Sequence, residues 1–322
     1  MSKRLKDYKI GVFRGGTSSE REISLLSGAN VLRALKKKGY QAIDVDLATE
    51  NERRILNIIS DKGIDLVFIA LHGGSGEDGR LQRILEEHSL PFTGSGAEAC
   101  RRAMDKTVSH RILKENKIPL PEYWIVDEGL PEFSRGDFPL VVKPHHCGSS
   151  IGVSIVKDKD LLQPACDAAG IHSPRVIVER YISGRELTVG IVGERTLPVV
   201  EVVFSGDFFD FSSKYEDDRT RFIVPADIDL RLGQTIQQLS RRVYAAIGCR
   251  HFARVDLRLD SASRPYVLEL NAIPGLTGHS LLPLAAAHAG IGFDELCEAI
   301  LIQAAPGPGK KSIYEESAQK KD

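Results

Sequence analysis

Apolar residues in the first hundred positions follow two alternating periods. Short apolar runs are typical of buried strands and occur at residues 9–13, 41–47 and 65–71. The segments 23–35 and 79–90, which follow two of these runs, repeat their apolar residues at near-helical spacing. Strands alternating with helices predict a parallel α/β unit over 1–100. Ligands of such a sheet bind beyond the carboxyl ends of its strands, so the polar loops at 15–24 and 72–79 are candidate binding loops.

The pattern changes after residue 100. In a second unit, 101–185, we expect a helix, a glycine-serine loop and three strands, at 105–117, 145–152, 119–126, 138–144 and 176–182. A third unit, 186–303, begins with strand pairs and contains a long helix at 230–247. Residues 304–322 are polar, charged and interrupted by Pro and Gly, which predicts a disordered tail.

A predicted hairpin in the third unit brings two carboxylates together. Its strands, RVDLRL and YVLELN, flank a six-residue turn, DSASRP, that is rich in Asp, Ser and Pro. Antiparallel pairing across this turn predicts three facing pairs: Leu259 with Tyr266, Asp256 with Glu269, and Arg254 with Asn271. Facing carboxylates destabilise a sheet, so we expect a cation between them, and oxygen ligands without His or Cys favour Mg²⁺ or Mn²⁺. The alternative is a solvated sheet face on which both carboxylates meet water.

Three further charged residues have positions that suit binding of a phosphorylated ligand. Lys143 ends the apolar strand LVVKP and is followed closely by GSSIG, whose amides and hydroxyls can bind phosphate. The Walker A pattern GxxxxGK[ST] is absent from the sequence. Glu179 follows three apolar strand residues, and Lys106 opens a predicted helix. Each also has a plain structural interpretation: an incidental lysine at a turn, an edge-strand carboxylate and a solvated surface lysine, respectively.

Other candidate residues lie in loops of the first and third units. Glu20 is at a predicted helix start, where a carboxylate also favours the helix dipole, and His72 precedes two glycines as a turn residue would. Lys214 and Tyr215 lie where an aromatic strand turns acidic, which also fits a loop with a packed tyrosine. Ser280 can cap the helix that begins LLPL. None of these decides a function alone.

Charge and cysteine content narrow the class of protein. The 322 residues include 43 basic and 44 acidic ones, a formal charge of -1, so no field of one sign favours nucleic acid or an acidic membrane. No apolar run reaches the roughly 18 residues of a membrane helix, and IGVF is too short for a signal-peptide core. Five dispersed cysteines without a CxxC pair indicate reduced cytoplasmic thiols. A nucleophilic Cys147 with His145 or His146 as its base lacks an identifiable third partner.

The order of the motifs is more specific than any one of them. GGTSSEREIS, ALHGGSGEDG, FTGSG, MDK, VVKP with GSSIG, RVDL and LELNAIPGLTGHSLLP follow one another at separations that resemble the D-alanine–D-alanine ligases of the ATP-grasp superfamily. The resemblance extends from about residue 9 to about residue 303. It implies an α/β and α+β fold in which a parallel N-terminal domain, 1–100, carries the first substrate site. Two α+β lobes, 101–185 and 186–303, then hold ATP, and the second of them carries the metal and the second substrate.

The resemblance also implies which residues bind the nucleotide and its metal. The implied ATP ligands are Lys106, Lys143, Ser149, Ser150, Glu179, Arg180, Tyr181, Ile182, Glu186 and Lys214. The implied ligands of two Mg²⁺ ions, with Mn²⁺ as a possible substitute, are Asp256, Glu269 and Asn271.

Substrate contacts follow from the same resemblance. The implied catalytic and substrate-binding residues are Glu20, His72, Ser149, Lys214, Tyr215, Arg254, Gly275, Ser280 and Leu281. Of these, Glu20 holds the ammonium of the first D-alanine, with Ser149 and Tyr215 linked to it. Arg254 and the Gly275 amide donate to the reacting oxygen, and Ser280 and Leu281 receive the second carboxylate. In this family ATP phosphorylates the first D-alanine, the amine of the second attacks, and D-alanyl-D-alanine for peptidoglycan precursors forms with ADP and phosphate.

Three departures from the family bear on loop closure and affinity. His146 and Cys147 stand where relatives often have Arg and Glu, Phe209 replaces a Tyr of some relatives, and 74–75 is Gly-Ser where a basic residue and glycine are common. Tyr215, following a lysine, favours an amine over D-lactate as second substrate.

Other functions remain as alternatives. These are a D-alanine–D-lactate or D-alanine–D-serine ligase, another ATP-grasp carboxylate–amine ligase, and a nucleotide-binding regulatory protein without turnover. The last would predict loss of metal or arginine positions, yet all are present. We expect a cytoplasmic homodimer that binds small molecules and neither nucleic acid nor membrane.

Overall fold

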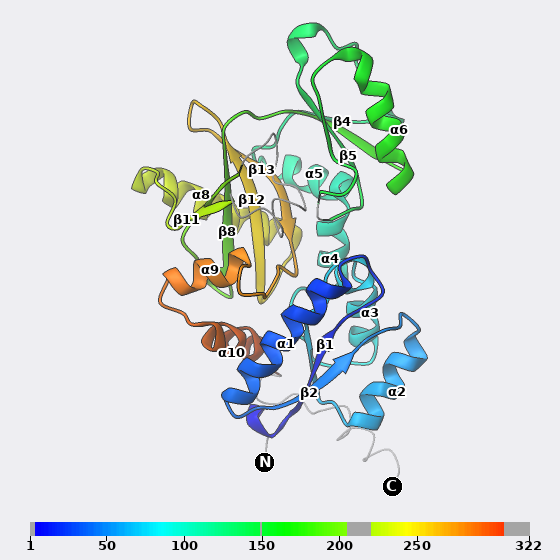
Figure 1. Cartoon of the computed structure of the whole chain (residues 1–322), viewed down its shortest axis with the longest axis vertical. Helices are drawn as coiled ribbons and strands as arrows, with labels where there is room; N and C mark the ends of the chain where they lie inside the picture. Colours follow the sequence, from blue (N-terminus) through cyan, green and yellow to red (C-terminus); the bar gives the residue numbers. More distant parts are fainter. Residues whose placement is uncertain (1–3, 149, 205–219, 306–322) are drawn as a thin grey trace.

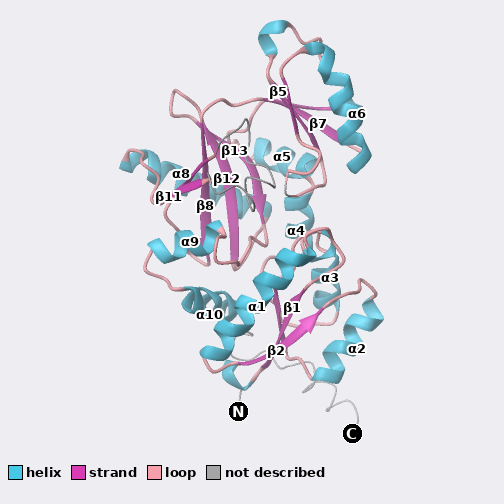
Figure 2. Cartoon of the chain, in the orientation of Figure 1, coloured by secondary structure: helices cyan, strands magenta, loops and turns pink. Residues whose placement is uncertain are grey.

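The computed structural model describes residues 4–148, 150–204 and 220–305. These residues form three sheets arranged along the long axis of the molecule (Figure 1). Strands make the centre of each unit and helices cover them (Figure 2). Outside the described residues lie positions 306–322 of the predicted tail and four residues of interest: Ser149, Phe209, Lys214 and Tyr215. The tail was predicted to begin at 304, but Ala304 is helical. No described helix has the length and apolar character needed to cross a membrane.

The N-terminal unit is a three-stranded parallel sheet in the order β2-β1-β3, which confirms the predicted parallel α/β arrangement. Its elements are η1 Leu5–Asp7, β1 Lys9–Arg14, α1 Arg21–Lys37, β2 Gln41–Asp46, α2 Glu52–Lys62, β3 Leu66–Ile69, η2 Gly74–Gly76 and α3 Arg80–Glu87. Local signals set their ends: Asn51 caps α2 by accepting from the Arg54 amide, and Gly63 ends it at φ 60°.

The second sheet is antiparallel and has the order β4-β7-β5-β6. It lies at the end of the molecule away from the N-terminal unit, with α6 packed against it (Figure 1). Its elements are β4 Tyr123–Ile125, η3 Val126–Glu128, η4 Arg135–Asp137, β5 Leu140–Pro144, β6 Ser154–Val156, η5 Lys159–Leu161, α6 Leu162–His172 and β7 Val176–Arg180.

The third sheet is the largest and lies between the other two (Figure 1). Its described strands pair in the order β11-β10-β8-β12-β13, with β9 on β8. They are β8 Arg185–Val192, β9 Arg195–Thr196, β10 Val200–Val203, β11 Arg221–Ile223, β12 Phe252–Leu259 and β13 Pro265–Asn271. The other helices within the described residues are α4 Ala97–Met104, α5 Lys106–Glu115, α8 Leu230–Ile247, α9 Leu281–His288 and α10 Phe293–Ala304. Asp229 caps α8 through the Arg231 and Leu232 amides.

Core packing joins residues that are distant in sequence. Leu296 and Ile300 of α10 belong to the same buried cluster as the N-terminal sheet, and α10 lies beside α1 (Figure 1). Cys100 and Leu113, from α4 and α5, belong to the cluster beneath β8 and β12. Helix α10 therefore packs into the N-terminal core, and α4 and α5 pack into the core of the third sheet.

The hairpin has the predicted register at its functional end and a different one near its turn. Asp256 faces Glu269 and Arg254 faces Asn271, as predicted. Leu259 does not face Tyr266; it faces Pro265, because the register shifts after Asp256. The extra residue in β13 is a β-bulge, which strict alternation of apolar and polar positions does not reveal.

A buried charged network ties α5 to the second sheet. The Glu179 Oε1 atom on β7 accepts from His110 Nε2 of α5 at 2.6 Å and lies 2.7 Å from Lys143 Nζ of β5. Burial lowers the pKa of His110, so the neutral ring donates through Nε2, and its buried Nδ1 has no partner among the described residues. Burial alone would raise the pKa of Glu179, but Lys143 and His110 outweigh it and lower the pKa to about 2.

The Glu179→Gln variant tests this network. Because it leaves Lys143 buried without its anionic partner, we expect a loss of about 3 kcal/mol in the free energy of unfolding at pH 7. The folded-state pKa of Glu179 lies below its ordinary value of 4.5, so its stabilisation is present above that value and disappears as the pH falls toward about 2. Urea unfolding across this range should show wild type and variant converging.

The matched control is Glu194→Gln, whose side chain is 95% exposed. It should change the free energy of unfolding by less than about 0.5 kcal/mol. A Glu179→Gln variant as stable as wild type at pH 7 would contradict a stabilising role for the network.

Candidate active site

Two cavities open beside each other on the third sheet. The nucleotide-side cavity, as we name it, lies between the second and third sheets, and the acceptor-side cavity lies between the third sheet and the N-terminal unit. Their empty volumes are about 1000 and 1070 Å³, including space open to solvent. Five described residues line both: Lys106, Cys147, Arg254, Glu269 and Leu281. The two cavities therefore meet at one small group of side chains, three of which are charged.

The nucleotide-side cavity collects the predicted nucleotide-binding residues that the structure describes. Those lining it are Lys106, Lys143, Ser150, Glu179, Arg180, Tyr181, Ile182 and Glu186. The other two predicted ATP ligands, Ser149 and Lys214, are outside the described residues. Strands β5, β7 and β8 thus supply one continuous lining from residues that span more than forty positions of sequence.

Arginine side chains shape this cavity in two ways. Arg258 lies with its guanidinium 5.4 Å from the ring centre of Tyr181 and 3.5 Å from the Glu186 carboxylate. The Arg180 side chain pairs with Glu122 and Asp137 at 2.9 and 2.8 Å. Because this guanidinium is already bound to carboxylates, we expect Arg180 to contribute to the cavity chiefly through its backbone.

The acceptor-side cavity contains the predicted substrate residues of the N-terminal unit. Glu20 and His72 both line it. Glu20 is at the start of α1, but its side chain makes no capping hydrogen bond to the described first turn. His72 is buried, and its Nε2 atom lies 2.9 Å from the hydroxyl of Ser27. The Glu20 carboxylate lies so close to Gly73 that a Cβ there would come within 2.6 Å of it, at a φ of 67° that also favours glycine.

Opposite these residues, the turn after β13 forms the other wall. Gly275, Ser280 and Leu281 all line the cavity. A Cβ at Gly275 would lie 2.7 Å from the Ser280 hydroxyl, so a larger residue here would displace that side chain. Ser280 occupies the N-cap position of α9, but the prediction that its side chain caps the helix is wrong for the described residues. Its hydroxyl turns back to accept from the Thr277 amide at 3.0 Å.

The metal-ligand candidates stand where the cavities join. Asp256 accepts a bidentate pair of hydrogen bonds from Arg254, at 2.8 and 2.7 Å, and one from Thr188 at 2.5 Å. Glu269 lies 3.5 Å from the Lys106 ammonium. Two cations thus already balance the facing carboxylates. Oxygen donors on adjacent strands, with cations that can yield to a stronger one, fit a hard divalent ion such as Mg²⁺.

Lys106 also links α5 to the loop that follows β5. It is buried, and its ammonium donates to the Cys147 carbonyl at 2.6 Å. The Cys147 thiol is partly buried, which raises its pKa, and it lies 3.8 Å from the His172 carbonyl. A raised thiol pKa disfavours the nucleophilic role considered for this cysteine. All five cysteines of the chain are free.

Three functional candidates were missed by the sequence reasoning. His110 is four residues after Lys106, on the same face of α5, and that spacing is the available signal. Thr188 is two residues after Glu186 on β8, so it shares a sheet face with it. Ser27 contacts both His72 and the Leu276 amide, at 2.9 and 3.4 Å, and this contact has no local sequence signal.

Comparison with known families agrees along most of the chain. A family model described as "D-ala D-ala ligase C-terminus" matches residues 127–302, and one described as "D-ala D-ala ligase N-terminus" matches residues 49–95. A D-alanine–D-alanine ligase of Bordetella pertussis is 40% identical over 305 residues, which cover 92% of this chain and 95% of the relative.

Solved structures give the same picture. The crystal structure of a Bacillus anthracis D-alanine–D-alanine ligase complexed with ATP superposes with a TM-score of 0.80 and 32% identity, covering 92% of this chain and 97% of the other. The VanG D-Ala:D-Ser ligase of Enterococcus faecalis superposes with a TM-score of 0.78 and 28% identity, covering 92% and 99%. With its fold, both cavities and these matches considered together, the chain belongs to the D-alanine–D-alanine ligase family of ATP-grasp enzymes.

Proposed function

We propose that this protein is an ADP-forming ligase that joins two D-alanine molecules into D-alanyl-D-alanine for peptidoglycan precursor synthesis. Membership of the family and the full-length identity to curated ligases support this activity. A D-Ala:D-Ser ligase among the similar structures keeps D-serine as the second candidate for the second substrate.

One observation carries the proposal in physical terms: the two cavities share Lys106, Arg254 and Glu269. A phosphoryl donor in one cavity and a carboxylate acceptor in the other would meet at these side chains. Phosphoryl transfer needs little covalent chemistry from the protein, but it needs the reactants in line and the developing charge neutralised. Lys106 and Arg254 place positive charge at this meeting point.

The charge of the nucleotide-side cavity fits a triphosphate that arrives with divalent cations. With Arg180 set aside because Glu122 and Asp137 already pair with it, the described lining has four cationic residues and four carboxylates: Lys106, Lys143, Arg254 and Arg258, against Glu179, Glu186, Asp256 and Glu269. A lining with nearly balanced charge repels a bare polyanion less than an acidic lining would. It can also bind a polyanion whose charge is neutralised by metal ions without a large net charge building up in the cavity. ATP as the co-substrate is consistent with this balance.

The proposed reaction proceeds in two steps. The carboxylate of the first D-alanine, held with its ammonium beside Glu20, attacks the γ-phosphorus of ATP, and the bond to the bridging oxygen breaks to release ADP. The amine of the second D-alanine, placed by Ser280 and Leu281, then attacks the acyl carbonyl. The tetrahedral oxyanion accepts hydrogen bonds from Arg254 and the Gly275 amide, and phosphate leaves.

Asp256, Glu269 and Asn271 would hold Mg²⁺ in this account. When bound, the ions neutralise phosphate oxygens during transfer. Arg254 and Lys106, which now balance the two carboxylates, would turn toward substrate oxygens instead. The Thr188 hydroxyl, which donates to Asp256 at 2.5 Å, would keep that carboxylate oriented.

Several broader proposals accompany the activity. We place the first substrate site in residues 1–100, the nucleotide between 101–185 and 186–303, and the reaction in the cytoplasm, where ATP is available. Residues 306–322 of the predicted disordered tail, together with Ser149, Lys214 and Tyr215, lie outside the described residues. That the protein forms a homodimer is a prediction based on its resemblance to the family.

The Glu269→Gln variant tests the metal assignment. Removing one carboxylate charge from the junction should lower turnover at least about a hundredfold, a change of about 2.7 kcal/mol in the activation barrier. The Glu194→Gln control, at a side chain 95% exposed, should turn over as wild type does. Circular dichroism should confirm that both variants fold. Undiminished activity in Glu269→Gln would contradict the assignment.

Identification of products tests the function itself. With ATP, Mg²⁺ and D-alanine alone, we expect ADP, phosphate and D-alanyl-D-alanine in equal amounts, with mass spectrometry identifying the dipeptide. Added D-serine or D-lactate should leave the dipeptide as the main product, and L-alanine should not replace D-alanine. A mixed product as the main species would overturn the second-substrate assignment. Absence of ADP release in every mixture would overturn the ligase function.

A further inference from the structure

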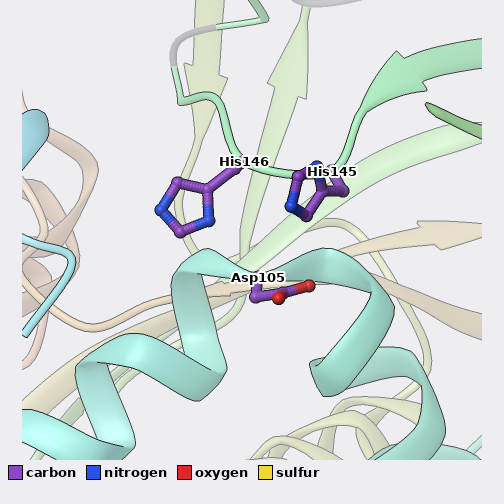
Figure 3. A group of neighbouring side chains, drawn as sticks. All are labelled: Asp105, His145 and His146. Atoms are coloured by element: carbon purple, nitrogen blue, oxygen red, sulfur yellow. The ribbon is translucent and has the colours of Figure 1, made fainter. Parts of the chain in front are cut away.

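A second group of ligand-type side chains lies beside the proposed active site and takes no part in the reaction above. Asp105 lies in the turn between α4 and α5. His145 and His146 lie in the loop after β5, and in the view of Figure 3 this loop is above that turn. One carboxylate oxygen and one ring nitrogen from each histidine all lie within 4.8 Å of one another. Two segments forty residues apart in sequence therefore bring three potential metal-ligand atoms close together.

The surroundings of His145 orient its ring as a metal ligand requires. The Nδ1 atom lies 3.2 Å from the Arg175 carbonyl oxygen and 2.6 Å from the Ser173 hydroxyl. A carbonyl oxygen can only accept, and a hydroxyl can accept as well, so both contacts are satisfied when Nδ1 carries the proton. The lone pair is then on Nε2. Metal-binding histidines characteristically donate their other nitrogen to a backbone carbonyl in this way.

Asp105 can bind an ion without giving up its structural role. It caps α5, accepting from the Thr107 amide at 3.0 Å, the Val108 amide at 3.2 Å and the Thr107 hydroxyl at 2.6 Å. All three bonds end on Oδ1. The second oxygen, Oδ2, can therefore act as a ligand while the helix cap stays intact.

From this arrangement we propose that Asp105, His145 and His146 form a binding site for one borderline divalent transition-metal ion of the Zn²⁺ class. Two imidazoles and a carboxylate suit such an ion, whereas Mg²⁺ prefers oxygen ligands alone. Ligands about 2.0–2.2 Å from Zn²⁺ lie about 3.5 Å from one another, so side-chain rotations of roughly 1 Å close the site. Water completes the fourth position.

The position of this site gives it a consequence for the active site. The amide of Lys106 donates to the His145 carbonyl at 2.9 Å, and the Lys106 ammonium donates to the Cys147 carbonyl at 2.6 Å. A bound ion would add a third link between the start of α5 and this loop. It would hold in place the backbone of Lys106, from which the side chain reaches the two cavities. The metal site itself does not depend on the proposed function, although this consequence does.

Zinc binding to the full-length protein tests the proposal. Equilibrium dialysis or calorimetry with ZnCl₂, in millimolar Mg²⁺ to occupy the oxygen-only site, should give one more bound Zn²⁺ for wild type than for His146→Ala. Asp105→Asn keeps a cap acceptor on α5 but removes the charged ligand. Because loss of an outer-shell partner already weakens metal binding about 10–100-fold, both variants should lose at least about tenfold in affinity.

His88→Ala is the matched control, since His88 is another surface histidine with a carboxylate, Glu52, within 3.3 Å. It should bind Zn²⁺ as wild type does, and the five cysteines are common to every variant. Thermal unfolding should confirm that all variants fold. Unchanged Zn²⁺ binding in either His146→Ala or Asp105→Asn would overturn the three-ligand site. Because binding is measured without substrates, failure here leaves the ligase proposal standing, and failure of the ligase assay leaves this site standing.

Discussion

The facing carboxylates of β12 and β13 are the constraint on which the site depends. Asp256 and Glu269 are paired across the hairpin, and two like charges about 5 Å apart repel by about 3 kcal/mol at an effective dielectric constant of about 20. Nearby cations offset this repulsion. Arg254 and Lys106 provide that charge here, and a divalent ion would provide it more strongly. The carboxylate pair therefore contacts both Arg254 and Lys106, and it lies where the two cavities meet.

The three sheets matter because they bring distant loops to this junction. The second and third sheets enclose one cavity, and the N-terminal unit closes the other. Helix α10 packs into the N-terminal core, so the chain's two halves hold one arrangement. Lys106 sits at the centre of this arrangement, contacting Glu269 on β13 and the loop after β5. The buried Lys106 side chain thereby connects that loop to Glu269 of the carboxylate pair.

Sequence reasoning predicted what local patterns encode. Alternation of strands and helices predicted the parallel N-terminal sheet, and the spacing of RVDL and LELN predicted that Asp256 faces Glu269. The bulge near Leu268 was missed because an inserted residue changes register without changing composition. His110 was missed because its role comes from burial against β5 and β7, which no local pattern specifies. The cluster at Asp105 likewise exists only once α5 and the loop after β5 are folded together.

Anomalous scattering from Mn²⁺ would test the central claim most directly. Crystals grown with Mn²⁺ and a non-hydrolysable ATP analogue should show manganese peaks within bonding distance of Asp256, Glu269 and Asn271. The adenine ring should then lie in the nucleotide-side cavity near Tyr181 and Ile182. Manganese bound elsewhere, or a nucleotide outside that cavity, would contradict the account of the facing carboxylates as the point where the two cavities exchange a phosphoryl group.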